Sequence, residues 1–199
     1  MPTLDTGYYN EYELRDMGIK SVGYNVRIQK NCTVIGIQNI TIGNNVRIDG
    51  YCTIAAANSG WVTIGSYVHI GAYACLTAGD GIIIEDFCGI SQRVSIYTRN
   101  DDYSGTYLSN PTVPEEYTNV HHGTVILKRH VIVGTSSVIL PDVSLGTGVA
   151  VGSLSLVKTN LEPWGIYAGV PVKKISNRSQ KLLDIEKEFL ESLSNQERL

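Results

Sequence analysis

A six-residue periodicity constrains the fold more than any other feature of this sequence. Over residues 127–158 an aliphatic residue recurs without a slip, and a small or β-branched residue follows four positions after each one. The aliphatic positions are Leu127, Val133, Ile139, Leu145, Val151 and Val157. An α-helix needs a period of about 3.6 residues and an isolated strand a period of about 2, so neither explains this spacing. A period of six is typical of a parallel β-helix, in which a short strand and a tight corner repeat.

The same register extends back to Val22 and predicts coils with three sides. Additional residues appear only after every third hexapeptide, ahead of Ile42, Ile64 and Ile84. Three hexapeptides therefore form one turn, and every insertion leaves the stack at the same corner. One coil cannot bury its apolar face alone, whereas stacked coils bury a continuous core. We expect an all-β domain over residues 22–176, with about six three-sided coils.

A long insertion interrupts the repeat between the hexapeptides that begin at Ile96 and Leu127. We place the inserted loop at residues 97–126. It contains several tyrosines, several carboxylates and two of the four histidines of the chain. Loops of this length inside a compact domain are uncommon and are often functional. We therefore expect this loop to carry part of a functional site rather than to be ornamental.

Both ends of the chain lie outside the repeat. In the capping segment 1–21, Asn10 and Glu13 have the spacing of a capping box, which predicts a short N-terminal helix over about Glu11 to Met17. The segment 177–199 has apolar residues at helical spacing with charged residues between them, which predicts a C-terminal amphipathic helix. We expect this second helix to pack on its own coil or on a neighbouring subunit.

Composition excludes several classes of protein. The net charge of −3 argues against a nucleic-acid-binding protein, whose binding face would be basic. No apolar run approaches the roughly 20 residues of a membrane span, so no membrane insertion is expected. No charged and then apolar signal segment opens the sequence, and we expect a cytoplasmic location.

The four cysteines do not predict a metal site. Cys32, Cys52 and Cys88 each follow an inward isoleucine by four residues, which is the position of the small inward residue. They are expected to be buried free thiols in the core. There is no C-x-x-C spacing of the kind that zinc sites use, so no metal cofactor is expected.

The hexapeptides, together with Ala168-Gly169-Val170-Pro171, resemble the hexapeptide-repeat acyltransferases, and among them the galactoside, maltose and surface-polysaccharide O-acetyltransferases. The resemblance covers about residues 22–176. It implies a left-handed parallel β-helix, a homotrimer, and acetyl-CoA as co-substrate in a groove between adjacent subunits. Carried over onto this sequence, the groove implies a set of coenzyme A contacts: Thr135, Ser153, Lys158, Thr159, Ala168 and Lys173.

Direct acyl transfer needs a general base, and histidine is the usual base near neutral pH. His69 and His130 fall at outward positions of the repeat and are expected to be surface or corner residues. His121 and His122 lie in the inserted loop and are the favoured source of the base. Neighbouring residues in an extended segment point in opposite directions, so only one of the two should face a given pocket.

The sequence departs from the family at one point. The galactoside and maltose enzymes have a catalytic histidine shortly after the strand that precedes the loop, whereas the matching stretch here, residues 97–102, has none. Either His121 or His122 replaces it, or a carboxylate does, and the candidates are Asp101 and Asp102. A carboxylate base needs a raised pKa, which burial or a like-charged neighbour can supply.

The side chains of the loop indicate a polyhydroxylated acceptor, since rings stack on sugar faces and polar groups bond to hydroxyls. Tyr97, Tyr103 and Asn119 are the candidate acceptor contacts. The favoured function is an acetyl-CoA-dependent O-acetyltransferase that acts on a hydroxyl of a sugar or nucleotide sugar. An N-acetyltransferase of an amino sugar and a non-enzymatic trimeric β-helix scaffold remain as alternatives. A relative of the metal-dependent carbonic anhydrases would need three zinc histidines across subunits, and only His121 and His122 could begin such a set.

Overall fold

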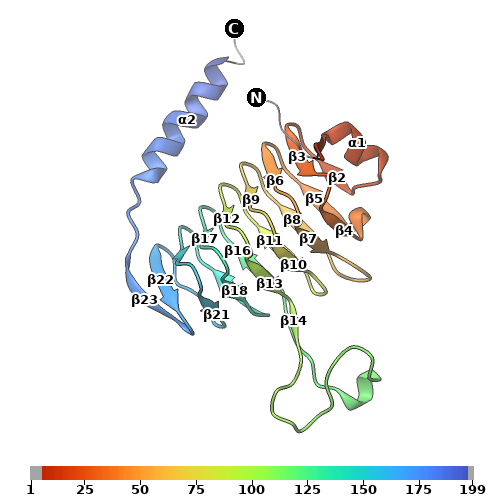
Figure 1. Ribbon diagram of the computed structural model, residues 1–199. Coiled ribbons are helices and arrows are strands. Elements are labelled where there is room, and N and C mark those ends of the chain that lie inside the picture. The colour runs from red at the N-terminus through yellow and green to blue at the C-terminus, as the bar shows by residue number, and fades with distance from the viewer. Residues whose placement is uncertain (1–5, 197–199) are drawn as a thin grey trace.

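In the computed structural model, which describes residues 6–196, the repeat forms a left-handed parallel β-helix with six complete three-sided coils and a partial seventh (Figure 1). Sheet A comprises β1 (Tyr8–Tyr9), β3 (Val26–Gln29), β6 (Val46–Ile48), β9 (His69–Ile70), β12 (Gly89–Ile90), β17 (Ile132–Val133), β20 (Ala150–Val151), β22 (Gly165–Gly169) and β23 (Val172–Asn177). Sheet B comprises β2 (Ser21–Val22), β5 (Ile40–Ile42), β8 (Val62–Ile64), β11 (Ile82–Ile84), β16 (Val125–Leu127) and β19 (Ser144–Leu145). Sheet C comprises β4 (Thr33–Ile35), β7 (Thr53–Ala55), β10 (Cys75–Thr77), β13 (Ser95–Tyr97), β18 (Val138–Ile139) and β21 (Leu156–Val157).

The chain passes from sheet B to sheet A to sheet C in each coil, and three corners result. We call them the B–A corner, the A–C corner and the C–B corner. The parallel pairing is in register, so that residues one coil apart stack directly, as Cys75 does on Thr53 and Ser95. An inner strand therefore pairs with strands of the coils on both sides, which explains how strands of two or three residues are stable.

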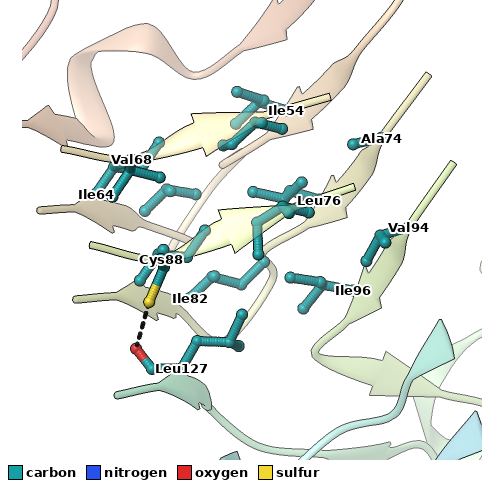
Figure 2. Close-up of a cluster of buried hydrophobic side chains, with 14 of the residues drawn as sticks. Ile54, Ile64, Val68, Ala74, Leu76, Ile82, Cys88, Val94, Ile96 and Leu127 are labelled. Carbon is teal, nitrogen blue, oxygen red and sulfur yellow. Dashed lines mark hydrogen bonds between the residues drawn. The ribbon is translucent and has the colours of Figure 1, made fainter. Parts of the chain in front are cut away.

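The core is a column of aliphatic side chains inside the prism. Leu76, Ile96 and Leu127 are fully buried there, and Figure 2 shows them converging from three different strands. The same figure shows the Cys88 thiol directed at the backbone oxygen of Leu127. The predicted positions of these core residues are thus confirmed, and Cys52 and Cys88 are buried free thiols. Cys32, which was also expected to be buried, is only half-buried, because it lies in the first coil at the end of the stack.

The corners impose a left-handed backbone on residues other than glycine. At the B–A corner Asn45, Tyr67, Phe87 and His130 have φ between 56° and 64°, a conformation that costs most residues roughly 1–2 kcal/mol. Hydrogen bonds between successive corners offset this cost, and the Asn44 side chain, for example, accepts from the backbone N–H of Tyr24.

Helix α1 (Glu11–Asp16) covers the first coil, as the capping box predicts. The Asn10 side chain accepts from the N–H groups of Tyr12 and Glu13, and Glu13 accepts from the N–H of Asn10. Strand β1, which the repeat did not predict, adds antiparallel to β3 beside this helix. At the other end the antiparallel hairpin β22–β23 closes the stack.

Helix α2 (Leu182–Gln196) follows the hairpin and runs back along the outside of the prism toward the N-terminal coils (Figure 1). Its Phe189 ring meets the rings of Tyr67 and Phe87 edge-on at the B–A corner. The helix therefore packs on its own β-helix, which is one of the two arrangements expected from its apolar stripe.

The inserted loop is shorter than the expected range 97–126. Tyr97 belongs to β13 and the residues 125–126 belong to β16, because both ends of the range still follow the coil pattern. The chain leaves the C–B corner on the two-stranded stem formed by β14 (Arg99–Asn100) and β15 (His121–His122). The loop between them contains the 3-10 turn Glu115–Tyr117 and projects away from the prism (Figure 1). A second 3-10 turn, Ile37–Asn39, lies at the same corner in the first coil.

Candidate active site

Two predicted site residues, His121 and His122, lie on strand β15 of the loop stem. His121 pairs with Asn100, and His122 pairs with Arg99. Both histidines are exposed, and their alternation along β15 directs them to opposite faces of the stem. The expectation that only one of them faces a given pocket agrees with this arrangement.

Asp80 anchors the base of the stem. Its Oδ2 accepts from Arg99 Nε at 2.6 Å, and its Oδ1 lies 3.4 Å from His122 Nδ1. The hydrogen bond from Arg99, assisted by the charges of Arg99 and His122, holds the pKa of Asp80 below its ordinary value. Its backbone is also fixed, since Asp80 N–H donates to Thr98 Oγ1 and Thr124 Oγ1 donates to Asp80 O. The C–B corner therefore presents a fixed carboxylate to one ring nitrogen of His122.

The contact with Asp80 bears on which ring nitrogen of His122 can accept a proton. A neutral imidazole that directs Nδ1–H at a carboxylate keeps Nε2 as a proton acceptor, and the ring of His122 is 64% exposed. The sequence indicated His122 as a candidate but gave no sign of Asp80. Asp80 lies between two glycines in what the repeat presents as an ordinary corner, one coil before the insertion.

The two loop aspartates differ in their surroundings. Asp102 accepts from the N–H of Ser104 at 3.0 Å and from its hydroxyl at 2.7 Å. These bonds hold the pKa of Asp102 below its usual range, which is the opposite of what a general base requires. Asp102 therefore lacks the raised pKa that a carboxylate base needs, because the turn it forms stabilises the charged carboxylate. Asp101 directly follows β14 and is half-buried.

The candidate acceptor contacts are spread along the same corner. Tyr97 stands on the outer face of β13 and is half-buried, whereas Tyr103 and Asn119 are exposed in the loop.

The candidate coenzyme A contacts occupy two different corners. Thr135 and Ser153 lie at the A–C corner, and Ala168 of β22 lies beside them, opposite Lys173 of β23. Lys158 and Thr159 follow β21 and lie exposed at the C–B corner. Sheet C separates the two groups within one chain.

The small residues of the A–C corner also have a packing role. A side chain at Gly134 would collide with the backbone nitrogen of Ser153 in the next coil. The coils therefore require glycine at this position independently of any ligand, and its presence alone is no evidence for coenzyme A binding.

The remaining histidines differ from each other. His69 is exposed on sheet A, and its Nε2 contacts Asp49 Oδ2 at 2.8 Å. His130 was expected at an exposed corner, but it is 7% exposed, because α2 covers it and Glu186 binds its ring. The repeat alone could not reveal a helix that packs over this corner. Neither residue lies near the loop stem.

Two further findings concern residues 6–196. Within this range the side chains of histidine, cysteine, aspartate and glutamate do not gather in a group of three or more that could hold a metal ion. Neither of the helices in this range is long and apolar enough to cross a bilayer.

No protein-family model matches the chain. A dTDP-4-amino-4,6-dideoxy-D-glucose acyltransferase from Escherichia coli is 48% identical over 182 residues, covering 92% of this chain and 94% of that protein.

Among solved structures, AntD, an N-acyltransferase from Bacillus cereus in complex with dTDP and 3-hydroxybutyryl-CoA, is 48% identical with a TM-score of 0.91. That match covers 96% of this chain and 100% of the other. An AntD variant in complex with dTDP-4-amino-4,6-dideoxyglucose and coenzyme A matches 94% of this chain and 99% of the other at 48% identity, with a TM-score of 0.90. A hexapeptide-repeat acetyltransferase from Vibrio cholerae is 16% identical and covers 85% of this chain and 80% of the other, with a TM-score of 0.56, so it shares the fold.

Proposed function

Because the chain belongs to the hexapeptide-repeat acyltransferases, we propose that it transfers an acyl group from a coenzyme A thioester to the amino group of a dTDP-linked 4-amino-4,6-dideoxy sugar. The observation that carries this proposal is the 48% identity, over 92% of the chain, to an acyltransferase named for that sugar nucleotide. AntD, a similar protein of known structure, is also an N-acyltransferase. The alternative of N-acylation is thus better supported than the O-acetylation that the sequence favoured.

The reaction requires one proton to be removed from the acceptor. The sugar nitrogen attacks the thioester carbonyl, the new C–N bond forms, and the C–S bond breaks. The nitrogen loses a proton to a base, and the departing sulfur of coenzyme A takes one up. A neutral amine is a stronger nucleophile than a hydroxyl. The base therefore mainly has to accept the proton that the amino nitrogen loses as the C–N bond forms.

The C–B corner supplies two candidates for this base, Asp101 and His122. His122 offers Nε2 while Asp80 holds its other nitrogen. Asp101 has a different kind of support. Two AntD variants of known structure carry substitutions at a serine and at an aspartate ten positions after that serine. In this chain Ser91 and Asp101 are the only serine and aspartate with that order and spacing. We propose that both contact the substrates.

The positions of Ser91 and Asp101 at two different corners favour a site formed between subunits. Ser91 lies at the A–C corner and Asp101 at the C–B corner of the same coil, with β13 between them. Residues 94–98, which include β13, separate the corners by roughly 13 Å at about 3.3 Å per residue. The candidate coenzyme A contacts divide in the same way between these two corners. A homotrimer that brings the A–C corner of one subunit against the C–B corner of the next would complete both sets, as closed cyclic symmetry allows.

The test is a transfer assay with matched acceptors. The purified protein is mixed with acetyl-CoA or 3-hydroxybutyryl-CoA and with dTDP-4-amino-4,6-dideoxyglucose, and both free thiol and product mass are followed. We expect turnover with the amino sugar and at least about a hundredfold less with the matching 4-hydroxy sugar nucleotide. The ratio of rates with the two thioesters identifies the acyl group. No turnover, together with no heat of binding for coenzyme A, would favour the scaffold alternative instead.

The base is identified by three substitutions. Asp101→Asn or His122→Asn should lower kcat by about 10²-fold, whichever is the base, and should remove the corresponding acidic limb of the pH profile. His121→Asn, on the opposite face of the same stem, is the matched control and should change kcat little. If both Asp101→Asn and His122→Asn kept the acidic limb of the pH profile, the result would contradict a base at this corner.

A further inference from the structure

An apolar cavity lies between α1 and the first coils, at the end of the β-helix remote from the hairpin β22–β23. Its volume is about 290 Å³. Its lining is mainly aliphatic and includes Leu14, Ile28, Cys32, Ile40 and Ile54. Cys32 is the one thiol in this lining and is half-buried. The proposed acyl transfer does not use this cavity.

A second thiol stacks directly above Cys32. Thr33 pairs with Thr53 in register, and Thr33 N–H donates to the backbone oxygen of Cys52 at 2.9 Å. Cys32 and Cys52 therefore occupy equivalent positions in adjacent coils, where backbones are roughly 4.8 Å apart. This spacing lies inside the range of about 4.4–6.8 Å between Cα atoms that disulfides span.

The two thiols have different environments. Cys52 is 1% exposed and its thiol contacts the backbone oxygen of Gly71 at 3.2 Å. The neighbouring Cys32 side chain and burial raise the pKa of Cys52. The neighbouring Cys52 side chain lowers the pKa of Cys32, whose sulfur also contacts the backbone oxygen of Asp49 at 3.1 Å. Cys32 is thus the more accessible thiol of the pair, and Cys52 lies directly beside it in the next coil.

We propose that Cys32 and Cys52 form a peroxide-reactive pair, in which Cys32 is oxidised first and Cys52 closes a disulfide between the first two coils. In the first step the Cys32 thiolate attacks hydrogen peroxide, an S–O bond forms, the O–O bond breaks, and the released hydroxide becomes water by taking a proton. In the second step the Cys52 sulfur attacks the Cys32 sulfenic acid, the S–S bond forms, and the hydroxyl leaves with the Cys52 proton as a second water. Reactive cysteines of this kind combine thiolate character, access and an adjacent resolving thiol.

The other cysteines show why the pair is selective. Cys88 stacks between Val68 and Val131 with no thiol in the adjacent coils, and burial raises its pKa to about 12. Cys75 lies on the outer face of sheet C between Thr53 and Ser95, which also lack sulfur. Neither has a resolving partner.

The test is mass spectrometry of the full-length protein, without reductant, after treatment with hydrogen peroxide near pH 7. The wild type should lose two hydrogen atoms, and peptide mapping should join Cys32 to Cys52. Cys52→Ser should instead trap a dimedone adduct on Cys32. Cys32→Ser, or Cys32→Ala if serine disturbs the core, should form neither product. Cys75→Ser and Cys88→Ser are the controls and should behave as the wild type does.

The rate of the first step should rise with pH as the Cys32 thiolate forms, at a lower pH than for an ordinary thiol, and dithiothreitol should restore the original mass. Oxidation of Cys75 ahead of Cys32 would overturn the proposal. So would a Cys52→Ser variant that takes up no dimedone while it remains folded by circular dichroism. Because these readouts do not involve acyl transfer, they are independent of the proposed function.

Discussion

Glu186 of helix α2 and His130 of the fifth coil are joined by a contact of 2.8 Å between Oε2 and Nε2. The other oxygen of the same carboxylate binds the guanidinium of Arg129, which also contacts Asp86 at 2.7 Å. Phe87 stacks against the His130 ring and packs beneath the Arg129 guanidinium. One carboxylate thus holds the C-terminal helix to the B–A corner.

Glu186→Gln should loosen this helix. The change removes a charged acceptor from two buried or half-buried donors, and hydrogen bonds to charged groups contribute about 2 kcal/mol. We expect the free energy of unfolding in urea to fall by about that amount, and protease cleavage after residue 178 to accelerate. Glu188→Gln, an exposed glutamate on the same helix, is the control and should change neither quantity. Equal effects in the two variants would contradict the anchoring role.

The same carboxylate predicts a pH dependence. Burial raises the pKa of Glu186, but the hydrogen bonds from Arg129 and His130 outweigh burial and set the pKa below the ordinary value of 4.5. The contribution of Glu186 is therefore present above about pH 4.5 and is lost as the pH falls through the lower folded-state value. The difference in unfolding free energy between wild type and Glu186→Gln should shrink as the pH is lowered from 6 to 3. A difference that grows on acidification would refute this assignment.

Leu76→Ala tests the core of the third coil. Leu76 is fully buried between Ile54 and Ile96, so the change leaves a cavity and should cost about 2–5 kcal/mol of unfolding free energy. Leu154→Ala is the matched control, because Leu154 is 71% exposed and its truncation should cost less than about 0.5 kcal/mol. Chemical denaturation followed by circular dichroism measures both.

Asn10→Ala tests the cap on the first coil. The substitution removes the acceptor of two N–H groups at the start of α1 and should cost about 1 kcal/mol. Asn10→Asp keeps an acceptor and should cost much less. Since α1 covers the cavity that contains Cys32, hydrogen exchange of the first coil should accelerate in Asn10→Ala alone, and no difference between the two variants would argue against the cap.

Removal of the inserted loop separates stability from function. Asn100 and His121 pair directly, so residues 101–120 can be replaced by Asn-Gly, which favours a two-residue hairpin turn. We expect the melting temperature to change by less than about 4 °C, because no residue of this loop is fully buried. Turnover of the amino sugar should fall by at least about 10²-fold, since the deletion removes Asp101 together with the loop that positions the acceptor. Unchanged turnover would place the acceptor site elsewhere.

The hexapeptide periodicity alone predicts the β-helix. The inward positions at Ile48, Ile70 and Ile90 repeat because each coil must bury the same side as the coil below it, and the extra residues mark one corner because only there does the chain leave the stack. The capping box at Asn10 was equally legible, since helix ends are satisfied locally. The family resemblance supplied the handedness, which no local pattern encodes.

Contacts between coils and between separate elements appear only in the folded chain. Asp80 meets His122 only because the coil beneath the loop brings them together, and residues 42 positions apart leave no periodic signal. His130 changed from an expected surface residue to a buried one because α2 packs over its corner. Cys32 and Cys52 became a pair for the same reason: stacking places equivalent positions of successive coils side by side, whereas the sequence shows only two small inward residues.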